Sequence, residues 1–167
     1  AYTLQKNLPT VVVLPKSAQE VAEVVRLCAR LDLPIIPRGA GTSLAGGTLA
    51  VGGGVMLVLT RMKEIEEINL RDRYAVVQPG VVNIWLTRAL AGTGYHYAPD
   101  PSSQGACTIG GNVAENSGGP HCLAYGVTTD HILGMEVVLA NGSTHWVGDL
   151  NREHPGYDLR GILIGSE

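Results

Sequence analysis

The sequence has few of the features that mark a disulfide-rich, zinc-binding or membrane-spanning protein. Only three cysteines occur in 167 residues, and no two form a CxxC pair, which argues against a disulfide framework and a zinc knuckle. No apolar run approaches the ~18 residues that span a membrane, and the N-terminus lacks the basic start and apolar stretch of a secretion signal. These absences predict a cytoplasmic chain with no metal site.

The charge and composition also exclude some partners. Lys and Arg total 12 against 15 Asp and Glu, and the net charge of −3 provides no field that would gather nucleic acid. A 45% hydrophobic content at this length is enough for one ordinary domain core. The first residue is not Met and the sequence stops at Glu167, so we expect a piece of a longer chain.

Periodic runs in the first part of the chain predict α/β organisation. Residues 10–15 and 34–37 are predicted strands on either side of a helix, giving a β-α-β unit. Ser17 and Glu20 have the spacing of a capping box at the start of that helix. Its predicted buried stripe consists of Val21, Val24, Val25, Cys28 and Leu31.

Further elements are predicted along the rest of the chain. Strands are expected at residues 55–59 and 74–78, and Asn141-Gly142 between two strand-like runs predicts a tight hairpin. A helix is expected from about residue 82 to 91, with Gly92 as its C-terminal cap. One face of that helix carries Val82, Trp85, Leu86 and Ala89.

Glycine, at 22 of 167 residues, is about twice as frequent as the roughly 7% typical of globular chains and is concentrated in two segments. The first segment is "PRGAGTSLAGG", residues 37–47, directly after a predicted strand. Successive backbone N–H groups in such a loop can form a concave anion site, and Arg38 adds a positive charge. Taken alone, the segment is compatible with either a phosphate loop or a glycine-rich surface turn.

Two familiar phosphate loops do not match this segment. The dinucleotide fingerprint G-x-G-x-x-G requires a small residue where this chain has Leu44, and no helical pattern follows. The P-loop requires a lysine after its last glycine, and no lysine lies between Lys16 and Lys63.

The second segment, "DPSSQGACTIGGNVAENSGGP" at residues 100–120, consists mostly of small residues. We interpret it as a loop in which the pairs "TIGG" and "SGG" leave the backbone bare enough for a flat ligand. The neighbouring asparagines supply amide donors and acceptors for the polar edge of a heteroaromatic ring. Together the two segments predict a site for an extended dinucleotide with a ring at one end.

These motifs carry a resemblance to a known family. "PRGAGTSLAGG", "YAPDPSSQGACTIGGNVAENSGGPHCLAYGVTTDHILGMEVVLANG" and "GILIGSE" resemble the FAD-binding half of the vanillyl-alcohol oxidase and p-cresol methylhydroxylase flavoproteins. Within them, the chain is similar to the flavoprotein subunit of glycolate oxidase and to D-lactate and D-2-hydroxyacid dehydrogenases. The resemblance implies a mixed α+β fold of the p-cresol methylhydroxylase type, truncated at its C-terminal end. It implies a smaller subdomain of about residues 1–70, a larger one from about residue 71, and a substrate cap that is absent.

The resemblance also implies roles for individual residues. Contacts with the FAD pyrophosphate, mainly through backbone amides, are expected from Pro37, Arg38, Gly39, Ala40, Gly41, Thr42 and Ser43. The ribityl and phosphate path is expected along Asp100, Ser102 and Thr108. The ribityl chain and the flavin ring are expected along Gly110, Gly111, Asn112, Glu115, Asn116, Ser117, Gly118 and Gly119.

Departures from the family pattern predict non-covalent FAD. Relatives that attach FAD covalently often have a histidine in the first loop, where this chain has Thr42 and Ser43. Cys107 lies where relatives often carry Ala or Ser. His121 and Cys122 are adjacent but have no further ligands at metal spacing, so we expect them to pack rather than to chelate. His96, His131, His145 and His154 are scattered, and none is expected to be a catalytic base.

The reaction implied by the resemblance is oxidation of a small 2-hydroxy acid, of the glycolate or D-lactate type, to the 2-keto acid. The base and the carboxylate clamp would come from the cap, so we expect no catalytic residue in this chain and no activity from it alone. Expected partners are other subunits of an oxidase complex, including an iron-sulfur subunit, through which the protein could associate peripherally with a membrane. The alternative is a non-catalytic FAD-fold subunit or a flavin electron-transfer module of a larger complex.

Overall fold

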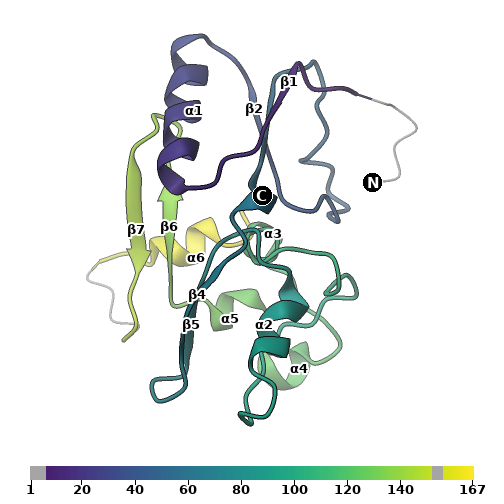
Figure 1. The fold of residues 1–167 in the computed structure, drawn as a ribbon, viewed down its shortest axis with the longest axis vertical. Coiled ribbons are helices and arrows are strands. Elements are labelled where there is room, and N and C mark those ends of the chain that lie inside the picture. Colours follow the sequence, from purple (N-terminus) through teal and green to yellow (C-terminus); the bar gives the residue numbers. More distant parts are fainter. Residues whose placement is uncertain (1–6, 152–155) are drawn as a thin grey trace.

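The computed structural model describes residues 7–151 and 156–167 and shows helices mixed with three small sheets (Figure 1). The predictions for the N-terminal start and for His154 fall outside these residues. Along the described chain, no helix combines the length and apolar character that crossing a membrane requires.

A three-stranded parallel sheet forms the N-terminal part. β1 (Val11–Val13), β2 (Ile35–Arg38) and β3 (Val55–Val58) are arranged in the order β1-β3-β2, so β3 pairs with both others. The predicted strands and the helix between them are confirmed, but β1 and β2 are not neighbours. β2 is an edge strand, and of its residues only Ile36 is buried.

Helix α1 (Ala18–Arg30) lies beside this sheet (Figure 1) and begins as predicted at Ser17, whose Oγ accepts a hydrogen bond from the Glu20 N–H at 3.2 Å. The Glu20 carboxylate accepts from the Lys16 N–H at 2.7 Å, one residue outside a strict capping box. The prediction of a buried Leu31 is wrong: its side chain is 58% exposed, because the helix has already ended at Arg30. The core cluster beneath α1 contains Val21, Val25, Leu57 and Met62, against which Val13, Val24, Ile35, Leu59 and Val138 pack.

The middle of the chain contains a 3-10 turn, η1 (Leu59–Arg61), and then an antiparallel hairpin of β4 (Ile65–Asn69) and β5 (Tyr74–Val77). β5 is confirmed, but sequence analysis missed β4. Its sequence IEEIN places two acidic residues in succession, which interrupts the alternation expected of a strand, and the pairing is irregular between Ile65 and Glu67.

Helix α2 (Asn83–Ala89) confirms the predicted helix with slightly shorter bounds, but only part of the predicted apolar face is buried. Trp85 is 40% exposed and Ala89 is also exposed, whereas Asn83 and Leu86 are buried. The apolar pattern identified Leu86, but it could not identify Asn83, because that buried side chain is polar.

Four short helices and a second hairpin complete the structure: α3 (Ile109–Glu115), α4 (Cys122–Tyr125), α5 (Thr128–His131), β6 (Gly134–Val138), β7 (Thr144–Gly148) and α6 (Leu159–Leu163). The predicted hairpin is confirmed. Its turn is a three-residue loop closed by the Leu139 N–H donating to the Ser143 carbonyl at 2.9 Å, and only Gly142 takes positive φ, at 74°.

The prediction of a continuous loop over residues 100–120 is wrong, because α3 occupies its centre. Two glycines in its first turn cost roughly 1 kcal/mol each relative to alanine. The Thr108 Oγ offsets part of this cost by accepting from the Gly111 N–H at 3.3 Å, and Ile109 and Asn112 are buried against the rest of the chain.

Candidate functional site

The first glycine-rich loop leaves β2 with a row of unused donors. Within the part of the chain that the structure describes, nothing accepts a hydrogen bond from the backbone N–H groups of residues 39–44. Thr42 is exposed, and Gly41 has a φ of 75°. Successive N–H groups without partners beside a positive-φ residue are typical of a concave anion site.

Arg38 folds back over this loop. Its Nη2 donates to the Ala40 carbonyl at 3.4 Å, and its guanidinium occupies the space in which a Cβ atom on Gly41 would stand. Glycine is therefore favoured at position 41 by its backbone conformation, and it also leaves room for the Arg38 guanidinium. The guanidinium adds positive charge directly beside the unpaired donors.

The two glycine-rich segments meet at Gly39 and Thr108. A Cβ atom on Gly39 would collide with the Thr108 Oγ, so the absence of a side chain allows this contact. Thr108 is 3% exposed and caps α3. Residues far apart in the sequence, both predicted to line one ligand, are thus brought into contact.

Some of the predicted site residues in α3 face the protein interior. The Gly110 N–H donates to the Pro79 carbonyl at 2.8 Å, and a Cβ atom on Gly110 would stand 2.7 Å from the Cβ of Pro79. Asn112 is 2% exposed; its Nδ2 donates to the Cys107 Sγ at 3.2 Å, and its Oδ1 accepts a hydrogen bond from Asn83. Gly110 and Asn112 therefore hold α3 against its surroundings.

Asn83 is a residue of the site region that sequence analysis missed. Its Nδ2 donates to the Pro99 carbonyl at 3.0 Å and to the Asn112 Oδ1 at 2.9 Å, and its backbone N–H donates to the Cys107 carbonyl at 2.9 Å. It is 1% exposed. An asparagine near a helix start is an ordinary surface residue by sequence, so no signal marked this one as buried.

The residues after α3 are anchored to α5. Asn116 ends α3 in the left-handed conformation with a φ of 47°, and its Oδ1 accepts from both the N–H and the hydroxyl of Thr129 at 2.9 Å. The Ser117 carbonyl accepts from the Thr128 N–H at 3.1 Å and from its hydroxyl at 2.6 Å. Glu115 is partly buried, and Ser102, in the preceding turn, is exposed.

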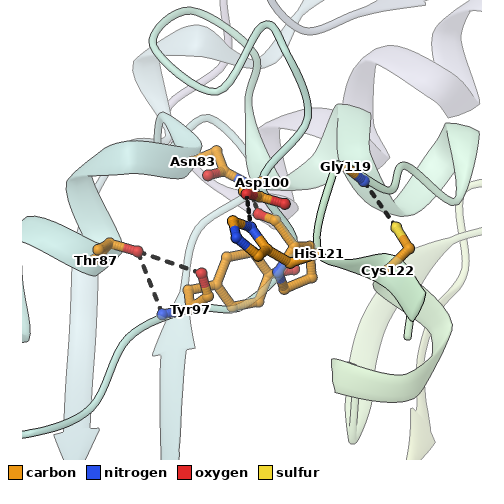
Figure 2. Close-up of polar contacts among 8 residues, drawn as sticks. Asn83, Thr87, Tyr97, Asp100, Gly119, His121 and Cys122 are labelled. Atoms are coloured by element: carbon orange, nitrogen blue, oxygen red, sulfur yellow. Dashed lines mark hydrogen bonds and ion pairs between the residues drawn. The ribbon is translucent and has the colours of Figure 1, made fainter. Parts of the chain in front are cut away.

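Asp100 and His121 lie on one side of the glycine pair Gly118–Gly119. The His121 Nδ1 is 2.5 Å from the Asp100 Oδ2, and Figure 2 shows the two side chains pointing toward each other. This hydrogen bond lowers the pKa of the Asp100 carboxyl from its ordinary value. Asp100 is thus held as an anion beside one of the predicted flavin-contacting segments.

A cavity of about 290 Å³ opens next to this pair. Its lining residues are Thr87, His96, Tyr97, Ala98, Asp100, Gln104, His121 and Tyr125. Burial raises the pKa of Tyr97 to about 12, with the Thr128 side chain acting in the opposite direction. Over residues 7–151 and 156–167, no group of three His, Cys, Asp or Glu side chains could hold a metal ion.

Comparison with known proteins gives a consistent match. The FAD binding domain family matches residues 9–148. The glycolate oxidase subunit GlcD of Escherichia coli (strain K12) is 49% identical over 162 residues, which cover 97% of this chain and 32% of that protein. The D-lactate dehydrogenase of Anaerostipes hadrus is 40% identical over 163 residues, covering 97% of this chain and 34% of that one.

A solved structure agrees with these sequence matches. Alkyldihydroxyacetonephosphate synthase superposes with a TM-score of 0.82 at 28% identity, over 93% of this chain and 28% of its own. The chain thus spans about a third of the length of the relatives that it matches.

Proposed function

The chain belongs to the FAD-binding domain family of the p-cresol methylhydroxylase type, and from this membership we propose that it is the FAD-binding part of a 2-hydroxyacid oxidoreductase. The substrate is a small 2-hydroxy acid of the glycolate or D-lactate type, oxidised to the 2-keto acid. The names of the two relatives support this substrate class.

The observation that carries the proposal is the row of unpaired N–H groups at residues 39–44. A pyrophosphate is the part of FAD that such donors suit, and Arg38 complements its charge. The loop is only partly covered by the rest of the chain, so these consecutive donors are accessible and a single bound anion can accept from several of them at once. The contact between Gly39 and Thr108 joins this loop to the second predicted segment.

In this proposal the first loop holds the pyrophosphate through its main chain, and Gly111 and residues 115–119 lie along the ribityl chain and the flavin ring, whereas Gly110 and Asn112 support them from the interior. Asp100, Ser102 and Thr108 lie along the path between them. Bound FAD supplies a ring that accepts hydride from the substrate, and the protein supplies orientation and electrostatics. With Thr42 and Ser43 in the first loop, we propose that FAD is held without a covalent bond.

The remaining parts of the proposal concern what lies outside the chain. The base and the carboxylate clamp come from another part of the full-length protein, so this chain alone does not turn over substrate. Other subunits, including an iron-sulfur subunit, complete the complex; the subunit status in the name of one relative supports a complex. We also propose a smaller subdomain of about residues 1–70 and a larger one from about residue 71: the separate parallel sheet of β1, β2 and β3 favours this division, whereas the β4–β5 hairpin crosses its boundary.

The test is anaerobic reduction of the flavin in the full-length protein. Glycolate, D-lactate and D-2-hydroxyglutarate are added side by side, and the visible flavin absorbance is followed. We expect at least one of them to bleach the flavin under these anaerobic conditions. A flavin that bleaches with dithionite but with none of the 2-hydroxy acids would overturn the proposed activity.

A further inference from the structure

His121 is a side chain to which neither the predicted FAD contacts nor the proposed reaction gives a role. It is 64% exposed, which would normally make it an ordinary surface histidine. Its partner Asp100 is different, because the carboxylate is only 19% exposed and its Oδ1 is buried without any hydrogen-bond partner among the described residues. His121 is therefore the side chain that holds a largely buried carboxylate.

The position of Asp100 determines where Gly119 can lie. A Cβ atom on Gly119 would collide with both the carbonyl and the carboxylate of Asp100, so the two backbones are in direct contact. On the other side, the Gly119 N–H donates to the Cys122 Sγ at 2.8 Å. Figure 2 shows Gly119 between Asp100 and Cys122.

The neighbouring glycine is confined in the same way. A Cβ atom on Gly118 would collide with the Cys122 Sγ and stand 3.1 Å from the Val127 Cγ1. The pair Gly118–Gly119 is thus clamped between Asp100 and the start of α4. A segment without side chains depends on its neighbours for its position, because glycine has the largest backbone freedom of any residue.

We propose that His121 is a positioning residue for the flavin-binding segment: by holding the Asp100 carboxylate, it fixes the backbone of Gly118–Gly119. The role rests on the proposed function, in which this glycine pair lines the flavin ring. His121 touches neither substrate nor FAD in this proposal and acts only through Asp100.

The chain offers a matched control in His96. Like His121, it lines the cavity, and its ring makes an edge contact with the ring of Tyr125. The hydrogen bond to Asp100 comes from His121 and not from His96. His96→Leu removes a histidine from the cavity and leaves the Asp100 contact intact. His121→Asn keeps an N–H donor near the place of Nδ1, and His121→Leu removes it.

The first measurement is FAD affinity in the full-length protein, read from flavin fluorescence. A hydrogen bond to a charged group is stronger than one between neutral groups, so we expect its loss in His121→Leu to weaken FAD binding about tenfold or more. We expect His121→Asn to recover most of this loss and His96→Leu to leave the affinity unchanged. Equal affinities for His121→Leu and His96→Leu would overturn the proposal.

The pH profile separates a positioning role from a merely structural one. His121 lowers the pKa of Asp100, so the native contact is present above the ordinary carboxyl pKa and is lost as the pH falls through the lowered value. Without the donor the pKa rises, so His121→Leu should release FAD at a higher pH than the parent protein. Three other titratable side chains, His96, Tyr97 and Tyr125, line the same cavity, and the profile of His96→Leu, which removes the histidine among them, is the control.

A second readout does not require FAD. Amide hydrogen exchange at Gly119, measured in the FAD-free protein, should become faster in His121→Leu and stay unchanged in His96→Leu. Unchanged exchange in His121→Leu would overturn the positioning role. If the parent protein binds no FAD while this exchange still responds to His121, the proposed function fails and the positioning of the glycine pair stands.

Discussion

The two glycine-rich segments have similar compositions and opposite uses of their backbone. In the first loop the N–H groups of residues 39–44 have no partners among the described residues, whereas in the second segment donors and acceptors are largely paired within the protein. Gly41 has positive φ in a loop whose N–H groups are unpaired, whereas the absence of a side chain on Gly110 lets α3 lie directly against Pro79. Glycine content alone therefore does not show which backbone groups are free to bind a ligand, whereas the hydrogen-bond pattern does.

Among variants that test the difference between the two glycine-rich segments, we expect Gly41→Val to have the largest effect. The change places a branched side chain at positive φ, a conformation that valine strongly disfavours, and displaces the Arg38 guanidinium, so we expect the loop to lose its shape. We expect the full-length protein to be purified without FAD, as read from its visible spectrum. Gly47→Val is the control, because a Cβ atom there meets nothing within 4 Å. Stoichiometric FAD in Gly41→Val would contradict the placement of the pyrophosphate.

Asn83→Leu tests the internally paired region. It leaves the Asn112 amide and the Pro99 carbonyl without their partner, and each unsatisfied buried group costs about 1–3 kcal/mol. We expect the free energy of unfolding in urea to fall by about that amount or more. Asn141→Leu, in the exposed turn of the second hairpin, is the comparison. An unchanged urea midpoint for Asn83→Leu would show that this hydrogen-bond network contributes nothing to stability.

Gly110→Ala should have a smaller effect of the same kind. The added methyl group stands within 2.7 Å of the Pro79 Cβ and 3.0 Å of its carbonyl oxygen, so α3 must shift, and overpacking costs about 1–3 kcal/mol. We expect a lower Tm and an FAD affinity that is retained below the transition. Gly105→Ala, where a Cβ atom has open space, should leave the Tm unchanged. A Gly110→Ala variant that loses FAD at full stability would place the ligand, rather than Pro79, against this glycine.

The smallest expected effect is that of Arg38→Ala. The main-chain donors remain, so FAD binding should weaken only several-fold, about what one partly exposed charge contributes. The difference from the parent protein should shrink as salt is added, because salt screens the lost charge. Titration of FAD at low and high ionic strength measures both. Complete loss of FAD would show that the side chain, and not the backbone, carries the site.

Local patterns in the sequence predicted several elements correctly. The helix over Ala18–Arg30, the strands at Val55–Val58 and Tyr74–Val77 and the hairpin around Gly142 follow from periodicity, capping and turn chemistry, which act over a few residues. The resemblance to the FAD-binding superfamily is confirmed by the match over residues 9–148.

The errors arose where distant contacts override local preference. A pair of glycines predicts a loop, but contacts with Val81 and Pro79 stabilise α3. Asn83 is buried only because Pro99, Cys107 and Asn112 surround it. Which of the small residues touch FAD stays a prediction, since α3 shows that some of them serve packing.

The strand order β1-β3-β2 has a consequence for how the chain acquires its structure. The two outer strands come first in the sequence but pair only with the central one, so neither has a partner until residues 55–58 are in place. The loop with the unpaired donors connects β2 to that central strand, and its far end becomes fixed only when the strand inserts. Sheet formation then has to wait for a long-range closure, which is slow compared with helix formation. On the ribosome, α1 can form while the loop of residues 39–44 is still an open chain, and one insertion event completes both the sheet and the loop.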